Sequence, residues 1–294
     1  MHDSIAKCVC LRHWLAALVL LALAAVCTAG QGPVFVVTHD AGPPSYLVGT
    51  MHTDDPRVLA LLERLRPLID QVDGVAIEVL PDAVTMLAVG AATLLPADQS
   101  LRDLIGVHRF AQVEDAVRDL GIPTEVLDRL KPWAVAVTLG MPVAQTGQVL
   151  DNEIYLYALQ HQRLAFGLES AAEQIAVFDG LSTDAQVELL DQMVGQQAQQ
   201  AQQIEQLTAA YLSGDLDQID QVADAQQMQV PEELQTWFDK ALLADRNRRM
   251  LTRLGDLLHR HSLFIAVGAL HLGGDAGLVA GLRDMGYSVE RWDR

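Results

Sequence analysis

Short apolar runs near both ends of the chain indicate β-strands. The runs Phe35–Thr38 and Tyr46–Val48 are rich in β-branched and aromatic residues, and the turn-forming segment between them (AGPP, 41–44) predicts a hairpin. Near the C-terminus, the run Leu263–Val267 (LFIAV) contains only apolar residues, which is typical of a buried strand. Both terminal regions are therefore expected to contribute strands to the core.

Each of these regions continues in the same way, as a strand, a Gly-x-x-His motif, a helix and a second strand. The first motif, GTMH (49–52), is followed by a helix that starts near Pro56 and by the apolar strand Gly74–Val79. The second motif, GALH (268–271), is followed by a helix with one apolar face and by a last strand at 287–292. The pattern predicts two matching units that bracket the chain.

The region between these units has a mostly helical pattern. One further strand is expected at Leu164–Leu168, and the capping box Ser170-x-x-Glu173 that follows it predicts the start of a helix. No flexible interdomain linker is evident. The expected fold is therefore α/β (α+β), with a central mixed sheet built from the two terminal units. We expect one domain over residues 30–294, with a large helical insertion at about 81–260.

A glutamine-rich segment stands out within this insertion. Thr183 is expected to open a long helix that continues toward Leu212, and glutamine occupies eight of the 15 positions from Gln192 to Gln206. Alanine and leucine are interspersed among these glutamines, and glutamine is itself a fair helix former. We interpret the segment as a solvated helix that covers or flanks the core.

The N-terminal 29 residues have the pattern of an export signal. Basic residues precede an apolar run at 14–26, and small residues follow it at 27–29. The alternative is an uncleaved anchor in the inner membrane, but a spanning helix needs roughly 20 apolar residues. The sequence thus predicts an exported protein, periplasmic or secreted, with no stable membrane span once the signal is cleaved. All three cysteines lie in this segment, so the remainder offers no disulfide or thiolate chemistry.

Charge and missing motifs exclude several classes of function. Lys and Arg number 20 against 38 Asp and Glu, a formal net charge of −18, which argues against nucleic-acid binding. The chain contains no Gly-x-x-x-x-Gly-Lys phosphate loop, no Gly-x-Ser-x-Gly nucleophile motif and no His-Glu-x-x-His zinc motif.

Four polar residues instead come at or just after the ends of predicted strands: His52, Glu78, Glu169 and His271. Functional residues of α/β sheets gather beyond the carboxyl ends of strands. In each Gly-x-x-His motif, the glycine is expected to let the chain turn sharply off the strand. Two neutral imidazoles and a carboxylate suit a divalent transition metal, which would lower the pKa of a water toward ~7 and polarise a carbonyl. This chemistry points to hydrolysis.

Each of these residues also has a structural interpretation. Either histidine could be an ordinary turn or core residue, and Glu169 could stabilise the start of the next helix through its macrodipole. Glu78 lies in an apolar strand and therefore needs a partner, either a metal or an arginine. Arg246 and Asn247 lie either in a solvated basic turn or in the site, where an arginine could hold a substrate carboxylate or stabilise an oxyanion.

Several segments of the chain resemble the TraB/GumN family, which includes the Tiki proteins. They are YLVGTMHTDDP (46–56), VAIEV (75–79), FGLESAAEQIAVFDGL (166–181), DRNRRM (245–250) and FIAVGALHLGGDAGLVAGLRDMGYSVE (264–290). The resemblance implies a metal-dependent protease or hydrolase that uses manganese or cobalt rather than zinc. It implies site roles for His52, Glu78 and His271, and less firmly for Glu169, Arg246 and Asn247.

Two functions from different classes follow. The first is an exported, metal-dependent hydrolase that cleaves a peptide or protein substrate: His52 and His271 would hold the metal, Glu78 would complete its shell or act as general base, and Arg246 would position a substrate carboxylate. The alternative is a non-catalytic protein that sequesters a peptide or an envelope component, suggested by the acidic surface and the glutamine-rich helix. A membrane-anchored structural component is a third possibility. The sequence predicts no oligomeric state.

Overall fold

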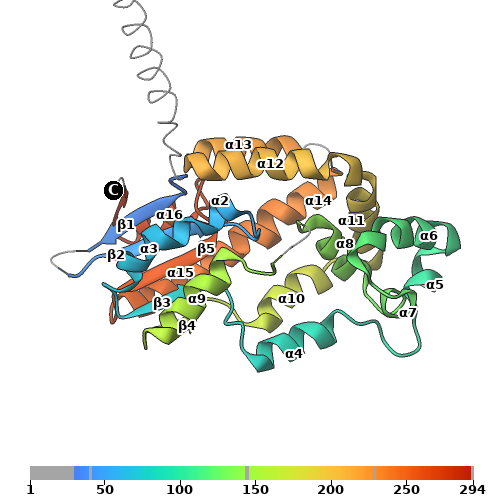
Figure 1. Ribbon diagram of the computed structural model, residues 1–294, viewed down its shortest axis with the longest axis horizontal. Helices are drawn as coiled ribbons and strands as arrows, with labels where there is room; N and C mark the ends of the chain where they lie inside the picture. The colour runs from blue at the N-terminus through green and yellow to red at the C-terminus, as the bar shows by residue number, and fades with distance from the viewer. Residues whose placement is uncertain (1–29, 40–41, 143–145, 228–229, 293–294) are drawn as a thin grey trace, which may run out of the picture.

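A six-stranded mixed sheet forms the centre of the protein (Figure 1). The computed structural model describes residues 30–39, 42–142, 146–227 and 230–292. The predicted export signal, 1–29, therefore lies outside the described residues. The strands are β1 (Val34–Thr38), β2 (Ser45–Thr50), β3 (Gly74–Ile77), β4 (Leu164–Gly167), β5 (Leu263–Gly268) and β6 (Ser288–Arg291).

The strand order, β4-β3-β5-β2-β1-β6, places β5 of the C-terminal unit between β3 and β2 of the N-terminal unit, and β6 at the edge beside β1. Strands β4, β3, β5 and β2 run parallel to one another, and β1 is antiparallel to both β2 and β6. The pairing of β1 with β2 confirms the predicted hairpin, although residues 40–41 of its turn lie outside the described part. The expected α/β fold with a mixed central sheet is confirmed.

The all-apolar run in β5 is explained by helices on both faces of the sheet. Phe264 and Ala266 pack in one hydrophobic cluster, and Ile265 and Val267 pack in another. The first cluster is covered by α3 (Leu61–Ile69) and α9 (Leu150–Gln160), and the second by α15 (Asp245–Leu258) and α16 (Leu278–Asp284). Because successive side chains of a strand point to opposite faces, a central strand between two helical layers must be apolar at every position.

The rest of the insertion forms a helical lobe beside the sheet, with a hydrophobic core of its own (Figure 1). Helices α5 (Leu101–Ile105), α6 (Val107–Ala116), α8 (Pro132–Gly140) and α11 (Thr183–Gly195) contribute its buried residues. Four further helices belong to the sheet layers or to the lobe and its surroundings: the short α2 (Pro56–Leu59) and α7 (Thr124–Leu127), and the longer α4 (Ala83–Ala92) and α10 (Ala171–Asp179). The capping box predicted at Ser170 and Glu173 is present at the start of α10.

The glutamine-rich segment is two helices rather than the single one expected. Helix α11 ends at Gly195, and α12 (Gln197–Ser213) begins after Gln196. Glycine is among the poorest helix formers, so a break at this point costs little. Ser182, one residue before Thr183, is the N-cap of α11. Helix α13 (Leu216–Gln227) packs beside α12 (Figure 1).

A π-helical segment connects the lobe to the sheet. This segment, η2, spans Phe238–Ala244, between α14 (Glu232–Trp237) and α15. π-helical turns are rare and are frequent at functional sites. Within the described residues, no helix combines the length and the apolar composition needed to cross a membrane.

Candidate active site

The ends of the four parallel strands bring the predicted residues to one edge of the sheet. His52 follows β2, Glu78 follows β3, Glu169 follows β4, and His271 ends a 3-10 turn (Ala269–His271) directly after β5. Parallel neighbouring strands end at the same edge, so residues far apart in the sequence meet there. His52, Glu78, His271 and Arg246 line a common cavity of about 290 Å³.

Glu78 has an arginine as its partner. Its Oε2 accepts from Arg246 Nη2 at 2.6 Å and from Gln174 Nε2 at 3.1 Å, and its Oε1 accepts from the Gly268 N–H at 2.7 Å. Burial alone would raise the pKa of Glu78, but His271, Arg246 and the Gly268 N–H lower it to about 2. Glu78 is therefore ionised at neutral pH, and the need for a partner that the sequence indicated is met by Arg246.

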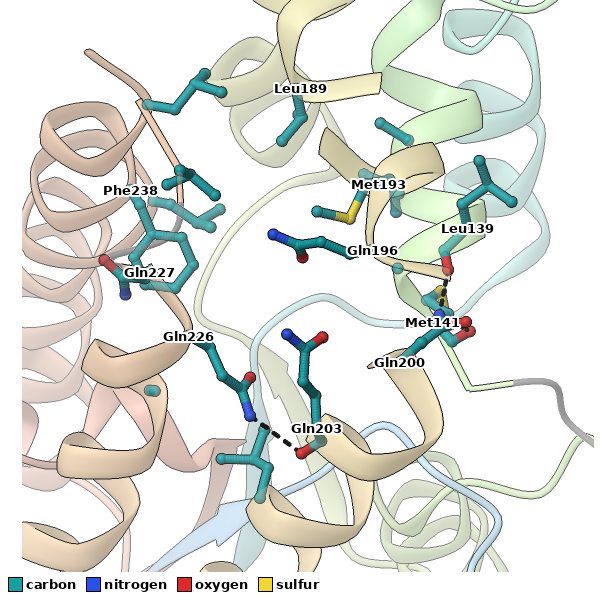
Figure 2. A pocket seen from close by; sticks show the side chains of 18 of the residues that line it. Leu139, Met141, Leu189, Met193, Gln196, Gln200, Gln203, Gln226, Gln227 and Phe238 are labelled. Carbon is teal, nitrogen blue, oxygen red and sulfur yellow. Dashed lines mark hydrogen bonds between the residues drawn. The ribbon is translucent and has the colours of Figure 1, made fainter. Parts of the chain in front are cut away.

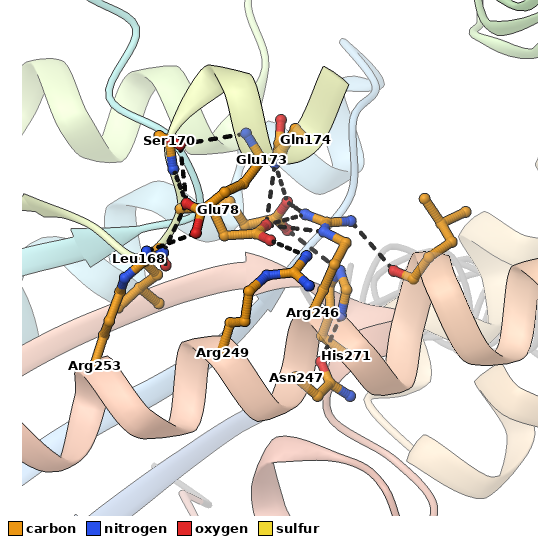
Figure 3. A network of polar contacts seen from close by, with 12 residues as sticks. Glu78, Leu168, Ser170, Glu173, Gln174, Arg246, Asn247, Arg249, Arg253 and His271 are labelled. Carbon is orange, nitrogen blue, oxygen red and sulfur yellow. Dashed lines mark hydrogen bonds and ion pairs between the residues drawn. The ribbon is translucent and has the colours of Figure 1, made fainter. Parts of the chain in front are cut away.

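Glu169 is the second buried carboxylate bound by the first turn of α15. Figure 3 shows Arg246, Arg249 and Arg253 along one face of this helix. The Glu169 side chain is fully buried, and its Oε2 accepts from Arg246 Nε at 2.8 Å and Nη2 at 2.6 Å. Arg249 adds a contact at 3.3 Å, and Arg253, further along the same face of α15, binds Glu173. Arg246, Arg249 and Arg253 thus turn toward carboxylates near the strand ends, and Arg246 is buried, whereas Arg248 is exposed and pairs with Asp245.

The protonation of His271 is fixed by Asn247. Asn247 Nδ2 donates to the Ala276 carbonyl at 2.8 Å, so its Oδ1 is the acceptor that faces His271 Nδ1 at 2.6 Å. Nδ1 therefore carries the proton. Burial lowers the pKa of His271 to about 4 despite the attraction of Glu78, so the ring is neutral at pH 7. His271 Nε2 consequently presents a lone pair, 3.9 Å from Glu78 Oε1.

His52 has a carboxylate in the corresponding place. Its Nδ1 lies 3.7 Å from Asp151 Oδ2, near the start of α9. The other oxygen, Oδ1, accepts from Thr50 Oγ1 at 2.5 Å, whereas Oδ2 is buried without a hydrogen-bond partner among the described residues. Burial raises the pKa of Asp151. The His52 side chain itself is 56% exposed, which leaves it the freest of the candidate residues to adjust its orientation.

The glycines of the two motifs provide space rather than a sharp turn. Neither Gly49 nor Gly268 has a positive φ angle. A Cβ on Gly49 would lie 2.6 Å from Pro33 Cγ and 3.0 Å from the Cα of Ala269, and a Cβ on Gly268 would lie 3.3 Å from Glu78 Oε1. The expectation of a glycine-dependent turn was therefore wrong. Glycine is needed because other atoms of the site approach the backbone closely.

The donor chemistry of the site fits a divalent cation. His271 Nε2 and Glu78 Oε1 both present lone pairs, an arrangement that a cation between them would stabilise. In addition, Glu78 and Glu169 are paired with Arg246 and Arg249, whereas the buried Oδ2 of Asp151 has no hydrogen-bond partner among the described residues. As the side chains stand, no three His, Cys, Asp or Glu residues in the described part of the chain are arranged to hold a metal ion.

Sequence reasoning missed two residues of this site, Asp151 and Gln174. Asp151 is a buried carboxylate in the first turn of a helix that covers the sheet, and an acidic residue in that position has the pattern of an ordinary helix start. Gln174 lies one turn into α10 and donates to both Glu78 and Glu169. Neither residue belongs to a recognisable motif, so only the fold reveals their place.

Comparison with known proteins finds one matching family model and several similar proteins. The family model described as TraB/PrgY/gumN matches residues 33–291. The chain is similar to "Metalloprotease TIKI1" of Danio rerio, with 25% identity over 87% of this chain and 62% of the relative. For "Metalloprotease TIKI1" of Xenopus tropicalis, the values are 24%, 87% and 61%, and for "Metalloprotease TIKI homolog" of Nematostella vectensis, 23%, 84% and 64%. The chain thus spans about three fifths of the length of these relatives. No solved structure matches it.

Proposed function

Because the chain belongs to the TraB/PrgY/gumN family, we propose that it is an exported, metal-dependent hydrolase that cleaves peptide bonds. One observation carries the proposal: the unprotonated Nε2 of His271 faces Glu78 Oε1 at 3.9 Å in a cavity that His52 also lines. The relatives described as metalloproteases support the same chemistry. Since the chain spans only part of their length, their activity is a hypothesis for this protein.

His52, Glu78 and His271 would hold the ion, and the resemblance to the Tiki proteins implies manganese or cobalt rather than zinc. The ion supplies a Lewis acid that polarises a carbonyl and makes water more acidic. Glu78 has one oxygen turned to Arg246 and the other turned toward His271. This division favours Glu78 as a ligand over Glu78 as a general base.

Arg246 has a positioning role in this proposal. Its Nε and Nη2 donate to Glu169 and Glu78, and its Nη1 donates to the Leu242 carbonyl at 3.4 Å. These contacts engage the guanidinium with the protein itself, so Arg246 keeps Glu78 aimed at the cavity rather than binding a substrate carboxylate. Asn247 holds the His271 ring with Nε2 toward Glu78, and Asp151 lies where it can orient His52.

The alternative is a protein that binds a peptide or an envelope component without cleaving it. One observation favours it: His52 is largely exposed, and the described histidines and carboxylates do not converge on one point. The two functions differ in what happens to a bound peptide. An enzyme releases fragments, whereas a sequestering protein returns the peptide intact after long incubation.

Metal dependence is the test of the proposal. We expect purified protein to lose peptide hydrolysis with a chelator and to regain it with Mn²⁺ or Co²⁺, and elemental analysis should find less metal in H52A and H271A. His161→Ala, at an exposed histidine outside the cavity, is the matched control. Unchanged hydrolysis and metal content in both H52A and H271A would refute the assignment.

Asp151→Asn tests the residue that the structure adds. Replacement of the carboxylate by an amide removes the negative charge beside His52, and loss of such an outer partner typically costs about 10–100-fold in metal affinity or activity. The metal-free protein should be as stable as before or more stable, since a buried carboxylate oxygen without a hydrogen-bond partner is destabilising. Calorimetric metal titration and urea denaturation measure the two effects. A loss of stability with unchanged metal affinity would assign Asp151 a purely structural role.

A further inference from the structure

A second cavity, of about 450 Å³ (Figure 2), shares lining residues with the cavity of the candidate active site. It lies between α8 and α11 on one side and α13 and the π-helical segment on the other, with α12 along its wall. Both cavities are lined by Leu207, Phe238, Leu242 and Leu270. Leu270 belongs to the second Gly-x-x-His motif and directly precedes His271. The larger cavity therefore lies directly beside the one at the strand ends, with these four side chains at their common boundary.

Among the described residues, no ionisable side chain lines this cavity. Its lining combines apolar residues such as Leu139, Met193 and Phe238 with glutamines of α12 and α13 and with Gln196, which connects α11 to α12. The glutamine-rich segment thus has two faces: the glutamines that line the cavity are partly buried, whereas Gln199, Gln202 and Gln206 are exposed. Although the protein has a formal net charge of −18, this cavity favours uncharged ligands over charged ones. A charged group placed there would lose its hydration without gaining a partner.

The amide groups in the cavity have unused hydrogen-bonding capacity. Gln200 donates to the Leu139 carbonyl and Gln226 to the Gln203 carbonyl, at 3.1 Å in the second case, so these two are held by the protein. The side chains of Gln196 and Gln203 point into the space (Figure 2) and make no hydrogen bond within the described part of the chain. Each carboxamide offers two donors and an acceptor, which is the complement of a peptide bond.

We propose that this cavity binds a peptide segment with uncharged, apolar side chains beside the bond to be cleaved, with Gln196 and Gln203 pairing with its backbone. The inference rests on the proposed peptidase function and defines its substrate class. The volume of the cavity, about 450 Å³, lies within the range of typical ligand pockets, about 300–1,000 Å³. An acyl chain would also fit the apolar wall, but it would leave the glutamine amides without partners, which costs free energy in a buried site.

Binding can be measured separately from cleavage. The probe is an acetylated and amidated hexapeptide of leucine, valine and alanine, titrated calorimetrically into the purified protein with chelator present. Gln203→Glu places a negative charge in the cavity with almost no change in shape, and we expect at least tenfold weaker binding. Gln202→Glu, on the exposed face of the same helix, adds the same charge outside the cavity and should leave the affinity unchanged. Equal thermal unfolding of the two variants excludes a folding defect.

Three results would overturn the inference: equal affinity in Q203E and the unsubstituted protein, tighter binding of a lysine-containing hexapeptide than of the apolar one, or binding of decanoic acid with no binding of either peptide. The outcome is separable from that of the peptidase proposal. If Q203E abolishes peptide binding but no peptide is ever cleaved, the cavity assignment stands and the peptidase proposal fails. If cleavage depends on metal but is indifferent to apolar residues and to Q203E, the cavity assignment fails alone.

Discussion

At the scale of single residues, the two candidate histidine ligands are supported in the same way. A side-chain oxygen faces the Nδ1 atom of each ring: Asn247 Oδ1 for His271 and Asp151 Oδ2 for His52. Histidine ligands of metals almost always donate their second ring nitrogen to such an oxygen, which fixes the tautomer. The distance from Nδ1 to this oxygen is 2.6 Å for His271 but 3.7 Å for His52. His271 is therefore already oriented, whereas His52 is not.

Asn247→Ala tests this orientation. Without the Asn247 oxygen, the His271 ring can carry its proton on Nε2, which would donate to Glu78 and remove the lone pair from the cavity. Outer partners of metal ligands contribute about 10–100-fold to metal affinity, and we expect a loss in this range by calorimetric titration with Mn²⁺. Asn152→Ala, at an exposed asparagine, is the control. If the two variants bind Mn²⁺ equally, the tautomer of His271 does not matter to the site.

At the scale of elements, the sequence predicts what local physics determines. The all-apolar run at 263–267 became the central strand, and the capping box at Ser170 and Glu173 marks the start of α10. The break after Gly195 was missed, because leucines and alanines on both sides of it favour a helix and only tertiary packing decides between one helix and two. The π-helical turn before Arg246 was missed for the same reason, since no sequence pattern distinguishes it from α-helix.

The capping box predicts a pH dependence of stability. The hydrogen bond from Arg253, with those from Ser170, lowers the pKa of Glu173 to about 2, below its ordinary value of 4.5. A carboxyl group with a lowered folded-state pKa stabilises the fold above its unfolded-state pKa, and this contribution is lost as the pH falls toward 2. Glu173→Gln should therefore destabilise the protein at pH 7, by about 0.5–1 kcal/mol because the pair with Arg253 is partly exposed to solvent screening.

Urea denaturation at pH 7, 4 and 2.5 measures this effect. The difference between the parent protein and E173Q should shrink steadily as the pH is lowered. Glu233→Gln, an exposed first-turn carboxylate of α14, is the matched control and should show little difference at any pH. A destabilisation by E173Q that is constant from pH 7 to pH 2.5 would mean that shape, rather than charge, explains the role of Glu173.

At the scale of the whole molecule, the site exists only because distant segments meet. His52 and His271 come from opposite ends of the chain and line one cavity because β5 inserts between β2 and β3. The sequence could predict the strand-end residues, since their position relative to the strands is local information. It could not predict Asp151 or the glutamine-lined cavity, because both depend on which helices pack against which strands.

Arg246 is where this assembly is most vulnerable. The buried guanidinium joins the ends of β3 and β4 to α15 through Glu78 and Glu169. Arg246→Met would leave two buried carboxylates without this partner, and removal of one member of a buried ion pair costs about 3–5 kcal/mol.

Arg249→Met is the matched control on the same helix. Arg249 is 36% exposed and contacts Glu169 at 3.3 Å, so its loss should cost about 1 kcal/mol or less. The double variant R246M/E169Q should regain part of the lost stability in urea denaturation, because it removes one of the two stranded charges. If R246M unfolds no more easily than R249M, the buried ion pairs do not hold the strand ends to α15, and apolar packing alone must do so.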